Sequence, residues 1–396
     1  MKKEEESIIK LAVVTQYGME TGGTEKFLQT IASFLPKDRY NVDYYYIASD
    51  SKRVSKVKEK QLLTNGVNLK PYSCDAINCK FKYLYQKNSN FFDIYKNDYD
   101  LILTGSSGIA EEPLTFIRNI PILQSIHYVD GADNQFNISR VLNISKFSEK
   151  LWVSKGGDKK RSILVSHPIY IPSFNQINIR KKFNISEDTF IYGFHQRNDD
   201  RIFSDIPLKA FKKINNEKVA FIICGGSKLY KKEAQDLNLK NCFFIPETDN
   251  NDIIYSFLNT INVYAHGRAD GELNSTALAE AMYFGLPIIT HPSNKFNGHL
   301  EVVTNNGMVA DNVDEYAKDM KKMLYDKQSY EEYSLASKEM FKKKYDLNNQ
   351  IFNFMSICES TLKNPYPNKL ERSIRGFFAE IKHIVQRNLI KFVNGK

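Results

Sequence analysis

The chain has 396 residues, more than one hydrophobic core usually supports, so we expect two domains. Hydrophobic residues make up 42% of it, yet no run of eighteen apolar residues that would cross a membrane occurs. The net charge of +9 favours anionic partners, among them nucleotides, nucleic acids and acidic membrane faces. A charged start and five scattered cysteines argue against a signal peptide and a disulfide framework, so we expect a cytoplasmic protein. Cys74 and Cys79 lack a second ligand pair, which argues against a zinc site.

The first half of the chain has an α/β pattern. The apolar run 8–14 predicts a buried parallel strand, and the glycine loop 17–25 leads into a helical pattern that Pro36 ends. Further strands are predicted at 42–47, 101–103 and 122–126. A strand, a glycine loop, a helix and a strand in this order are typical of a doubly wound α/β domain.

The pattern restarts after a linker that contains two prolines, residues 165–172. Strands are predicted in the second half at 190–194, 219–224, 261–264 and 287–290. We therefore expect domains at 1–168 and 169–345, followed by C-terminal helices over 346–396. Since ligands of open α/β sheets bind beyond the strand ends, the two halves are expected to face a central cleft.

The most informative stretch is 270–289, where seven residues separate Glu272 from Glu280. Between them Asn274, Ser275 and Thr276 are suited to begin a helix, whose free amides and positive dipole end would attract a diphosphate. If residues 272–280 were helical throughout, roughly 12 Å along the axis would separate the glutamates. That distance is about the reach from the ribose to the sugar of an extended nucleotide-sugar.

This stretch resembles the motif E-G-F-G-x-x-x-x-E-A-M-A-x-G-x-P-V of the retaining glycosyltransferases of family 4, whose fold is called GT-B. The residues that match it are Glu272, Glu280, Ala281, Met282, Gly285 and Pro287. The sequence departs from it at 273–275, where the family commonly has Phe-Gly. The resemblance implies an α/β protein of two Rossmann-like domains, the first for the acceptor and the second for the donor, with C-terminal helices returning to the first. It also implies that Glu280 binds the ribose hydroxyls and Glu272 those of the donor sugar.

Other positions acquire roles from the same resemblance. Gly22 and Gly23 match the family's glycine loop near the donor phosphates, because glycine lets the backbone approach closely and tolerates positive φ. His127, after the strand 122–126, would contact the donor sugar near the reacting carbon. Arg197 and Arg201 take the place of the arginine and lysine that clamp the diphosphate, four residues apart instead of five.

Two smaller matches concern the nucleotide. Gly226 falls in the turn that lines the nucleotide pocket, and Glu247 falls where the family contacts the base. The resemblance implies transfer with retention from a uridine or guanosine diphosphate sugar, which is a substrate, to a glycan, lipid-linked or other hydroxyl acceptor. The leaving phosphate would take the acceptor's proton. No metal-binding Asp-x-Asp is evident and arginines can replace the ion, so we predict neither a metal nor a cofactor.

Other classes of protein fit less well. A nicotinamide-dependent enzyme should show G-x-G-x-x-G after its first strand, where this chain has only Gly22 and Gly23. A nucleic-acid partner is not expected, because the aromatic residues do not interleave with a basic patch. A non-catalytic nucleotide-sugar- or glycan-binding relative of the same fold stays open.

Residues 372–393 form a basic amphipathic pattern. Apolar residues recur at helical spacing, at Ile374, Phe377, Phe378, Ile381, Ile384, Val385, Leu389 and Phe392, with arginines and lysines mostly elsewhere on the wheel. Such a helix packs on its own protein or lies in an anionic membrane interface, and both interpretations stay open, with packing favoured. Membrane contact would place the protein at the inner face of a membrane and would suit a lipid-linked acceptor.

Overall fold

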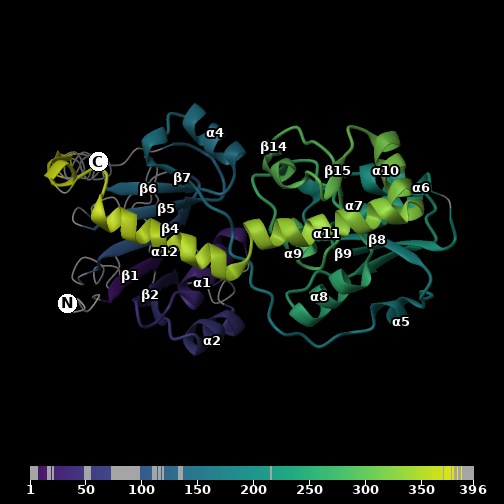
Figure 1. The fold of residues 1–396 in the computed structure, drawn as a ribbon, viewed down its shortest axis with the longest axis horizontal. Helices are drawn as coiled ribbons and strands as arrows, with labels where there is room; N and C mark the ends of the chain where they lie inside the picture. Colours follow the sequence, from purple (N-terminus) through teal and green to yellow (C-terminus); the bar gives the residue numbers. More distant parts are fainter. Residues whose placement is uncertain are drawn as a thin grey trace, which may run out of the picture. The chain divides into compact units, whose positions relative to one another are not determined.

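The computed structural model describes residues 8–15, 19, 22–48, 55–72, 99–108, 114, 117, 120–132, 137–214, 216–368, 370–375, 377, 378, 381 and 385. Cys74 and Cys79 lie outside these residues. The chain forms two compact units, Met1–Pro168 with Asn348–Lys396 and Ile169–Leu347 (Figure 1). Each unit has its own parallel sheet.

The sheet of the first unit has seven strands in the order β3-β2-β1-β4-β5-β6-β7, with every neighbouring pair parallel. The strands are β1 (Ile9–Val14), β2 (Tyr40–Ile47), β3 (Asn68–Tyr72), β4 (Leu101–Ser106), β5 (Ile122–Ile126), β6 (Ile138–Asn143) and β7 (Ser162–Leu164). The four strands predicted in this half are confirmed. Because β4 follows β3 in the chain but pairs with β1, the strand order reverses between β1 and β4.

The helices of the first unit are α1 (Gly23–Phe34), α2 (Lys56–Thr64), α4 (Lys146–Ser154), a 3-10 helix (Lys159–Arg161) and α12 (Leu347–Lys363), whose first residue belongs to the second unit. The helix predicted after the glycine loop is α1, and its apolar face is buried, with Phe27, Leu28 and Ile31 at most 2% exposed. Helix α1 ends just before Pro36, which has no backbone N–H to continue the ladder. Helix α4 begins with a capping box between Ser145 and Ser148.

The second unit has a six-stranded parallel sheet in the order β10-β9-β8-β11-β13-β15 and a separate parallel pair, β12 with β14. Its strands are β8 (Phe190–Gln196), β9 (Val219–Gly225), β10 (Cys242–Ile245), β11 (Val263–Ala265), β12 (Gly271–Glu272), β13 (Ile288–Thr290), β14 (Phe296–Asn297) and β15 (Gly307–Val309). The four predicted strands are again confirmed. Here the order reverses between β8 and β11.

Its helices are α5 (Ile179–Phe183), α6 (Ile206–Lys212), α7 (Lys228–Asp236), α8 (Asn251–Thr260), α9 (Thr276–Tyr283), α10 (Val313–Tyr325) and α11 (Lys327–Lys344), with 3-10 helices at Asp200–Ile202 and Gly298–Val302. The core strands are continuous apolar runs because helices cover a parallel sheet on both faces. In β9, for example, Val219 to Cys224 are all buried.

Helix α12 confirms that a C-terminal helix belongs with the first unit. Arg39 Nη2 lies 2.7 Å from Glu359 Oε1, and Arg140 Nη2 donates to the backbone oxygen of Asn364 at 3.2 Å. One face of α12 is buried, with Phe354 only 2% exposed. The opposite face carries Phe352, which is 68% exposed.

The segment after α12 exposes its apolar residues. Residues 370–375, 377 and 378 are helical, and Leu370, Ile374, Phe377, Phe378, Ile381 and Val385 are exposed. The other apolar positions predicted for this stripe, Ile384, Leu389 and Phe392, lie outside the described residues. No helix in the described part of the chain has the length and hydrophobicity needed to cross a bilayer.

Helix α12 is predicted to contribute strongly to the stability of the first unit. Phe354→Ala should cost about 3 to 5 kcal/mol of unfolding free energy, because a large buried side chain is lost. Phe352→Ala, two residues away on the exposed face, should change it by about 0.5 kcal/mol or less. Urea unfolding followed by the fluorescence of Trp152, the chain's single and fully buried tryptophan, reports on this unit. Equal losses in the two variants would contradict the assignment.

Candidate functional site

The predicted site residues of the second unit gather at one edge of its sheet. Two of them, Gly226 and Glu247, follow the strands β9 and β10. Two residues without a predicted role lie at the same edge, His195 near the end of β8 and Arg268 shortly after β11. All these strands are parallel, so their carboxyl ends lie on the same edge. The reversal of strand order between β8 and β11 opens the sheet at this edge, where ligands of doubly wound domains bind.

Arg197 and Arg201 are brought together by a carboxylate that lies between them in the sequence. Arg201 donates from Nε and Nη2 to the two oxygens of Asp199, both at 2.9 Å, and Arg197 Nη2 lies 3.0 Å from Asp199 Oδ2. The hydrogen bonds from Arg201 hold the pKa of Asp199 well below its ordinary value. The arginine side chains are 58% and 84% exposed, whereas Asp199 is 12% exposed. Each guanidinium group is therefore held by Asp199 through some of its nitrogens, while most of the side chain stays exposed to solvent.

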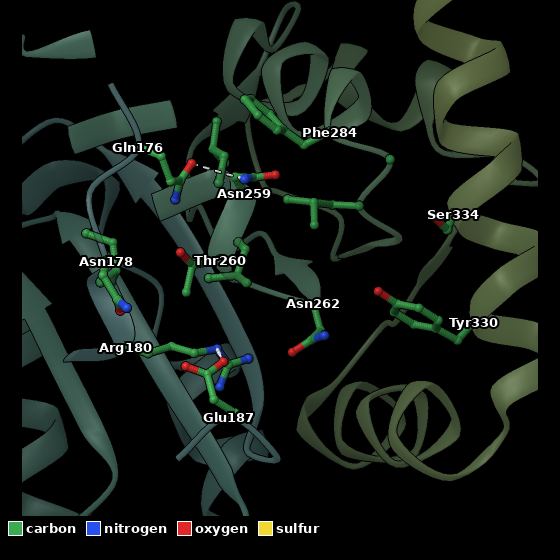
Figure 2. A pocket seen from close by; sticks show the side chains of 15 residues that line it. Gln176, Asn178, Arg180, Glu187, Asn259, Thr260, Asn262, Phe284, Tyr330 and Ser334 are labelled. Atoms are coloured by element: carbon green, nitrogen blue, oxygen red, sulfur yellow. Dashed lines mark hydrogen bonds and ion pairs between the residues drawn. The ribbon is translucent and has the colours of Figure 1, made fainter. Parts of the chain in front are cut away.

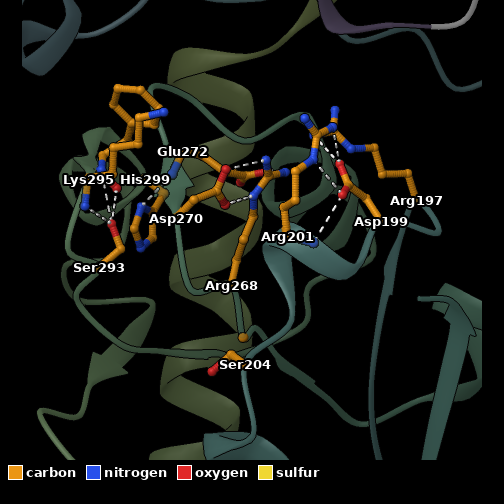
Figure 3. A network of polar contacts seen from close by, with 12 residues as sticks. Arg197, Asp199, Arg201, Ser204, Arg268, Asp270, Glu272, Ser293, Lys295 and His299 are labelled. Atoms are coloured by element: carbon orange, nitrogen blue, oxygen red, sulfur yellow. Dashed lines mark hydrogen bonds and ion pairs between the residues drawn. The ribbon is translucent and has the colours of Figure 1, made fainter. Parts of the chain in front are cut away.

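Glu272 belongs to a second cluster of opposite charges (Figure 3). Arg268 donates from Nη1 to Glu272 Oε1 at 3.0 Å, and from Nε and Nη2 to the two oxygens of Asp270 at 2.7 and 3.2 Å. His266 Nε2 lies 3.6 Å from Glu272 Oε2. Burial alone would raise the pKa of Glu272, but His266 and Arg268 lower it to about 2. Glu272 is thus an ionised, largely buried carboxylate.

Two more histidines lie around this cluster. His299 Nδ1 is 3.3 Å from the backbone N of Glu272, which donates to it, and His299 Nε2 is 3.1 Å from the backbone oxygen of His291. Burial lowers the pKa of His299 to about 4, and His266 adds to this effect. His299 therefore acts as a neutral hydrogen-bonding group near neutral pH. The described residues contain no group of three or more His, Cys, Asp or Glu side chains arranged to hold a metal ion.

The helix predicted between the two glutamates begins at Thr276. Ser275 is its N-cap and accepts from the backbone N of Leu278 at 3.1 Å. Asn274 Oδ1 accepts from the backbone N of Ser275 at 2.9 Å and from the Tyr345 hydroxyl at 3.3 Å. The side-chain oxygen of Asn274 is therefore already hydrogen-bonded within the protein. Glu272 lies in β12, before the helix, so the axial distance estimated for a continuous helix over 272–280 does not apply.

Glu280 lies on α9 and is 5% exposed. Its Oε2 is 2.9 Å from His195 Nε2, and His195 Nδ1 is 3.3 Å from the Tyr264 hydroxyl, which donates to the backbone oxygen of His195 at 3.0 Å. Burial raises the pKa of Tyr264 well above its usual range, and the carboxylates of Glu272 and Glu280 raise it further. Tyr264 is therefore within electrostatic range of both predicted glutamates.

The glycine turn after β9 brings two strand ends together. Gly225 and Gly226 have φ of +77° and +74°, and the N of Gly226 donates to the backbone oxygen of Gln196 at 2.8 Å. A Cβ at Gly225 would lie 2.1 Å from that oxygen, so only glycine fits there. Glu247 Oε1 accepts from the backbone N of Asn198 at 3.1 Å. Glu247 thus supports the loop that carries Arg197.

In the first unit Gly22 and Gly23 begin α1. Gly22 is its N-cap, with φ of −63°, so the tolerance of positive φ that the sequence suggested is not used at this position. A Cβ at Gly22 would lie 2.2 Å from Glu25 Oε2, whereas a Cβ at Gly23 would meet nothing within 4 Å. Glycine at position 22 leaves room for the Glu25 carboxylate, and glycine at position 23 leaves open space.

His127 follows β5 at the carboxyl edge of the first sheet. Its Nε2 is 2.8 Å from the Ser125 hydroxyl, and its ring packs against Phe27 and His167 at centroid distances of 5.2 and 4.9 Å. Burial and the neighbouring His167 lower the pKa of His127 well below its usual range. Burial also lowers the pKa of His167 to about 4. Both imidazoles are therefore neutral near pH 7.

A separate pocket of about 480 Å³ lies at the other edge of the second sheet. Asn262 precedes β11, Leu286 precedes β13 and Glu187 precedes β8, so the pocket adjoins the amino ends of the strands. Figure 2 shows amide and hydroxyl side chains in its lining beside Arg180 and Glu187, with a hydrogen bond of 3.1 Å between Asn259 and Gln176. The strand-end residues of the candidate site, among them Gly226 and Glu247, lie at the carboxyl edge instead, which is the edge that doubly wound sheets use.

Sequence reasoning assigned no role to four residues of the site, Asp199, His195, His266 and Arg268. Each holds a predicted residue in place, as the contacts above show. The signal that could have found them is their position near strand ends. His195 is the penultimate residue of β8 and Asp199 comes three residues after that strand, while His266 directly follows β11 and Arg268 comes two residues later.

A family model matches part of the second unit, and solved structures match most of the chain. Residues 175–340 match the family model described as glycosyl transferases group 1. Comparison with curated proteins gives no match. Among solved structures, the chain is similar to HepE from Anabaena in complex with UDP, with 17% identity, a TM-score of 0.69, and 89% of this chain and 100% of that one covered. HepE has also been solved with UDP-glucose.

A glycosyltransferase from Rickettsia africae is similar at 13% identity, with a TM-score of 0.71 and 90% and 100% of the two chains covered. Sucrose-phosphate synthase from Thermosynechococcus elongatus is similar at 16% identity, with a TM-score of 0.67 and coverages of 90% and 99%. At these identities the likeness establishes the fold, which is GT-B.

The buried histidines of the first unit predict a pH-dependent stability. The pKa of His167 is about 4 in the folded chain and near 6.5 when unfolded, so the unfolded state binds more protons between these values. Stability should therefore fall as the pH drops from 6.5 to 4, by about 3 kcal/mol from this residue. His167→Gln should flatten that slope, measured by urea unfolding through Trp152 fluorescence at pH 7, 6 and 5. An unchanged slope would show that His167 does not titrate in this way.

Proposed function

We propose that the protein is a glycosyltransferase that moves a sugar from a nucleotide-sugar to a hydroxyl acceptor. The observation that carries this proposal is one sheet edge that holds two exposed cations, Arg197 and Arg201, together with two buried carboxylates, Glu272 and Glu280. Cations suit a diphosphate, and buried carboxylates suit the hydroxyls of a ribose and a sugar. The match of residues 175–340 to group 1 glycosyl transferases supports the same activity.

The donor would bind along this edge in a defined direction. Glu280, braced by His195, would accept hydrogen bonds from the ribose, and Glu272 would accept them from the sugar. The turn at Gly226 and the loop supported by Glu247 would line the nucleotide pocket. The solved complexes of HepE with UDP and UDP-glucose support a uridine donor, and a guanosine donor is the alternative.

The diphosphate would lie between these two ends. The segment Asn274, Ser275 and Thr276 would offer the amides at the start of α9, where the helix dipole favours negative charge.

We infer that the sugar is transferred with retention, as in family 4. The bond from the sugar to the diphosphate breaks while the acceptor oxygen bonds to the same face, and the leaving phosphate oxygen takes the acceptor's proton. Arg197 and Arg201 would stabilise the charge that grows on the diphosphate, sharing their donors between it and Asp199. Because these cations supply the charge, the reaction would need no metal ion and no cofactor.

One observation favours a second candidate, a non-catalytic relative that binds a nucleotide-sugar or a glycan. Asp199 already offsets part of the positive charge of the two arginines, which weakens their effect on a leaving group. Slow hydrolysis of the donor without an acceptor, on the wild type and Arg197→Ala, separates the two. Hydrolysis that the substitution removes supports the enzyme, and nucleotide-sugar binding without any hydrolysis or transfer supports the binding protein.

Donor binding should be visible as a thermal shift. A nucleotide at one hundred times its dissociation constant should stabilise the protein by about 2.7 kcal/mol, a shift of several degrees. We expect such a shift with one of UDP, UDP-glucose, GDP or GDP-mannose, unaffected by EDTA and lost in Glu280→Ala. Folded protein that shifts with none of them would refute the donor site.

The tail suggests where the enzyme works. The exposed residues Leu370, Ile374, Phe377, Phe378, Ile381 and Val385 are spaced as one helical stripe, while residues 369–396 hold seven Lys and Arg against two Glu. Their exposure does not support the packed alternative for these residues. We propose that this tail binds an anionic membrane face from the cytoplasm, which would suit a lipid-linked acceptor.

Vesicle binding tests this contact. The wild type should sediment with vesicles of phosphatidylglycerol and phosphatidylcholine and not with phosphatidylcholine alone. The double variant Phe377→Ser with Phe378→Ser should lose most of this binding, and Phe352→Ser, which removes an equally exposed phenylalanine on α12, should keep it. If the wild type stays in the supernatant, or both variants bind alike, the tail is not the membrane contact.

A further inference from the structure

We propose that Arg268 and Asp270 are positioning residues that fix the carboxylate of Glu272 for the donor sugar. This inference rests on the proposed function, because it assigns how the sugar end of that site is held. The three side chains form one cluster at the carboxyl end of β11 (Figure 3).

Arg268 binds its two partners differently. Its Nε and Nη2 form a fork on both oxygens of Asp270, at 2.7 and 3.2 Å, which leaves Nη1 for Glu272 Oε1 at 3.0 Å. Such a bidentate contact fixes the plane of a guanidinium. Asp270 therefore sets the direction in which Arg268 presents its third donor, and Arg268 sets the position of Glu272.

The exposure of Arg268 separates it from the two arginines of the proposed diphosphate clamp. Its side chain is 17% exposed, against 58% for Arg197 and 84% for Arg201. Burial alone would lower the pKa of Arg268, but the carboxylates of Glu272 and Asp270 raise it, so it stays charged. A mostly enclosed cation whose donors go to two carboxylates is suited to orient them rather than to bind phosphate.

The backbone between the two carboxylates is built to bring them to one guanidinium. Gly271 has φ of +64°, and a Cβ there would lie 1.8 Å from the backbone oxygen of Phe296. The glycine lets the chain turn so that Asp270 and Glu272, two residues apart, both reach Arg268.

Glu272 is also held from its other sides. Its Oε2 faces His266 Nε2 at 3.6 Å, and its backbone N donates to His299 Nδ1 at 3.3 Å. A glutamate otherwise samples several rotamers, so this enclosure pre-organises it for the bound sugar. Arg268 and Asp270 provide the charged part of this enclosure.

The test compares a nucleotide with its sugar adduct. Dissociation constants for UDP and UDP-glucose, with GDP and GDP-mannose in parallel, are measured by calorimetry on the wild type, Arg268→Lys, Asp270→Asn and Glu272→Gln. Each of the three substitutions should weaken binding of the nucleotide-sugar about tenfold or more. The dissociation constant of the plain nucleotide should change less than twofold. Asp205→Asn, which removes an exposed carboxylate paired with Lys209 on α6, is the matched control and should change neither.

A second measurement separates positioning from general support. In the Glu272→Gln background, adding Asp270→Asn should raise the dissociation constant of the nucleotide-sugar less than twofold, because the effect of Asp270 passes through Glu272. The inference would be overturned if the effects of Asp270→Asn and Glu272→Gln on nucleotide-sugar binding were fully additive. It would also be overturned if nucleotide and nucleotide-sugar binding weakened equally, or if Asp270→Asn bound both with wild-type affinity. A wild type that binds none of the four ligands would instead refute the proposed function, and this inference with it.

Discussion

The parallel direction of the strands is the constraint on which the candidate site depends. In both sheets every pairing between neighbouring strands is parallel, so residues that follow different strands meet at one edge. His195 and Arg268 are 73 positions apart in the sequence, but both come at the carboxyl ends of the neighbouring strands β8 and β11. Antiparallel neighbours would have sent one of them to the opposite edge. The strand order reverses at these two strands, and in doubly wound sheets this is where a crevice opens beyond the carboxyl ends of the strands.

Charge pairing divides the arginines of this edge into two kinds. Arg197 and Arg201 share Asp199 and keep most of their surface in water, so another anion can reach them without displacing buried groups. Arg268 is enclosed with Asp270 and Glu272, where removing one partner would leave an unpaired buried charge. The same residue type is therefore suited to receive an anion in one place and holds carboxylates in the other, and the exposed fraction of the side chain distinguishes the two.

Much of the architecture was predictable because it is encoded locally. Apolar runs identified the eight expected strands, and the polar residue Ser275 before an alanine-rich stretch identified the start of a helix. The contacts of the site join segments that are far apart in the sequence, and a local sequence pattern cannot predict such contacts. The pairing of Glu280 with His195 joins residues 85 positions apart. Glu272 lies in a short strand next to Gly271, whose φ is positive. Gly22 instead has a negative φ, and its missing side chain leaves room for the Glu25 carboxylate.

The membership of α12 in the first unit has a consequence for how the chain is made. The first unit is discontinuous, since residues 1–168 are completed only by residues from 348 onward. The second unit is a continuous segment, so during synthesis it can finish folding while the first unit still lacks one of its layers. Until α12 is made, the surface on which its buried face packs, with Phe354 2% exposed, stays open on the nascent first unit, and transiently exposed apolar surface favours aggregation.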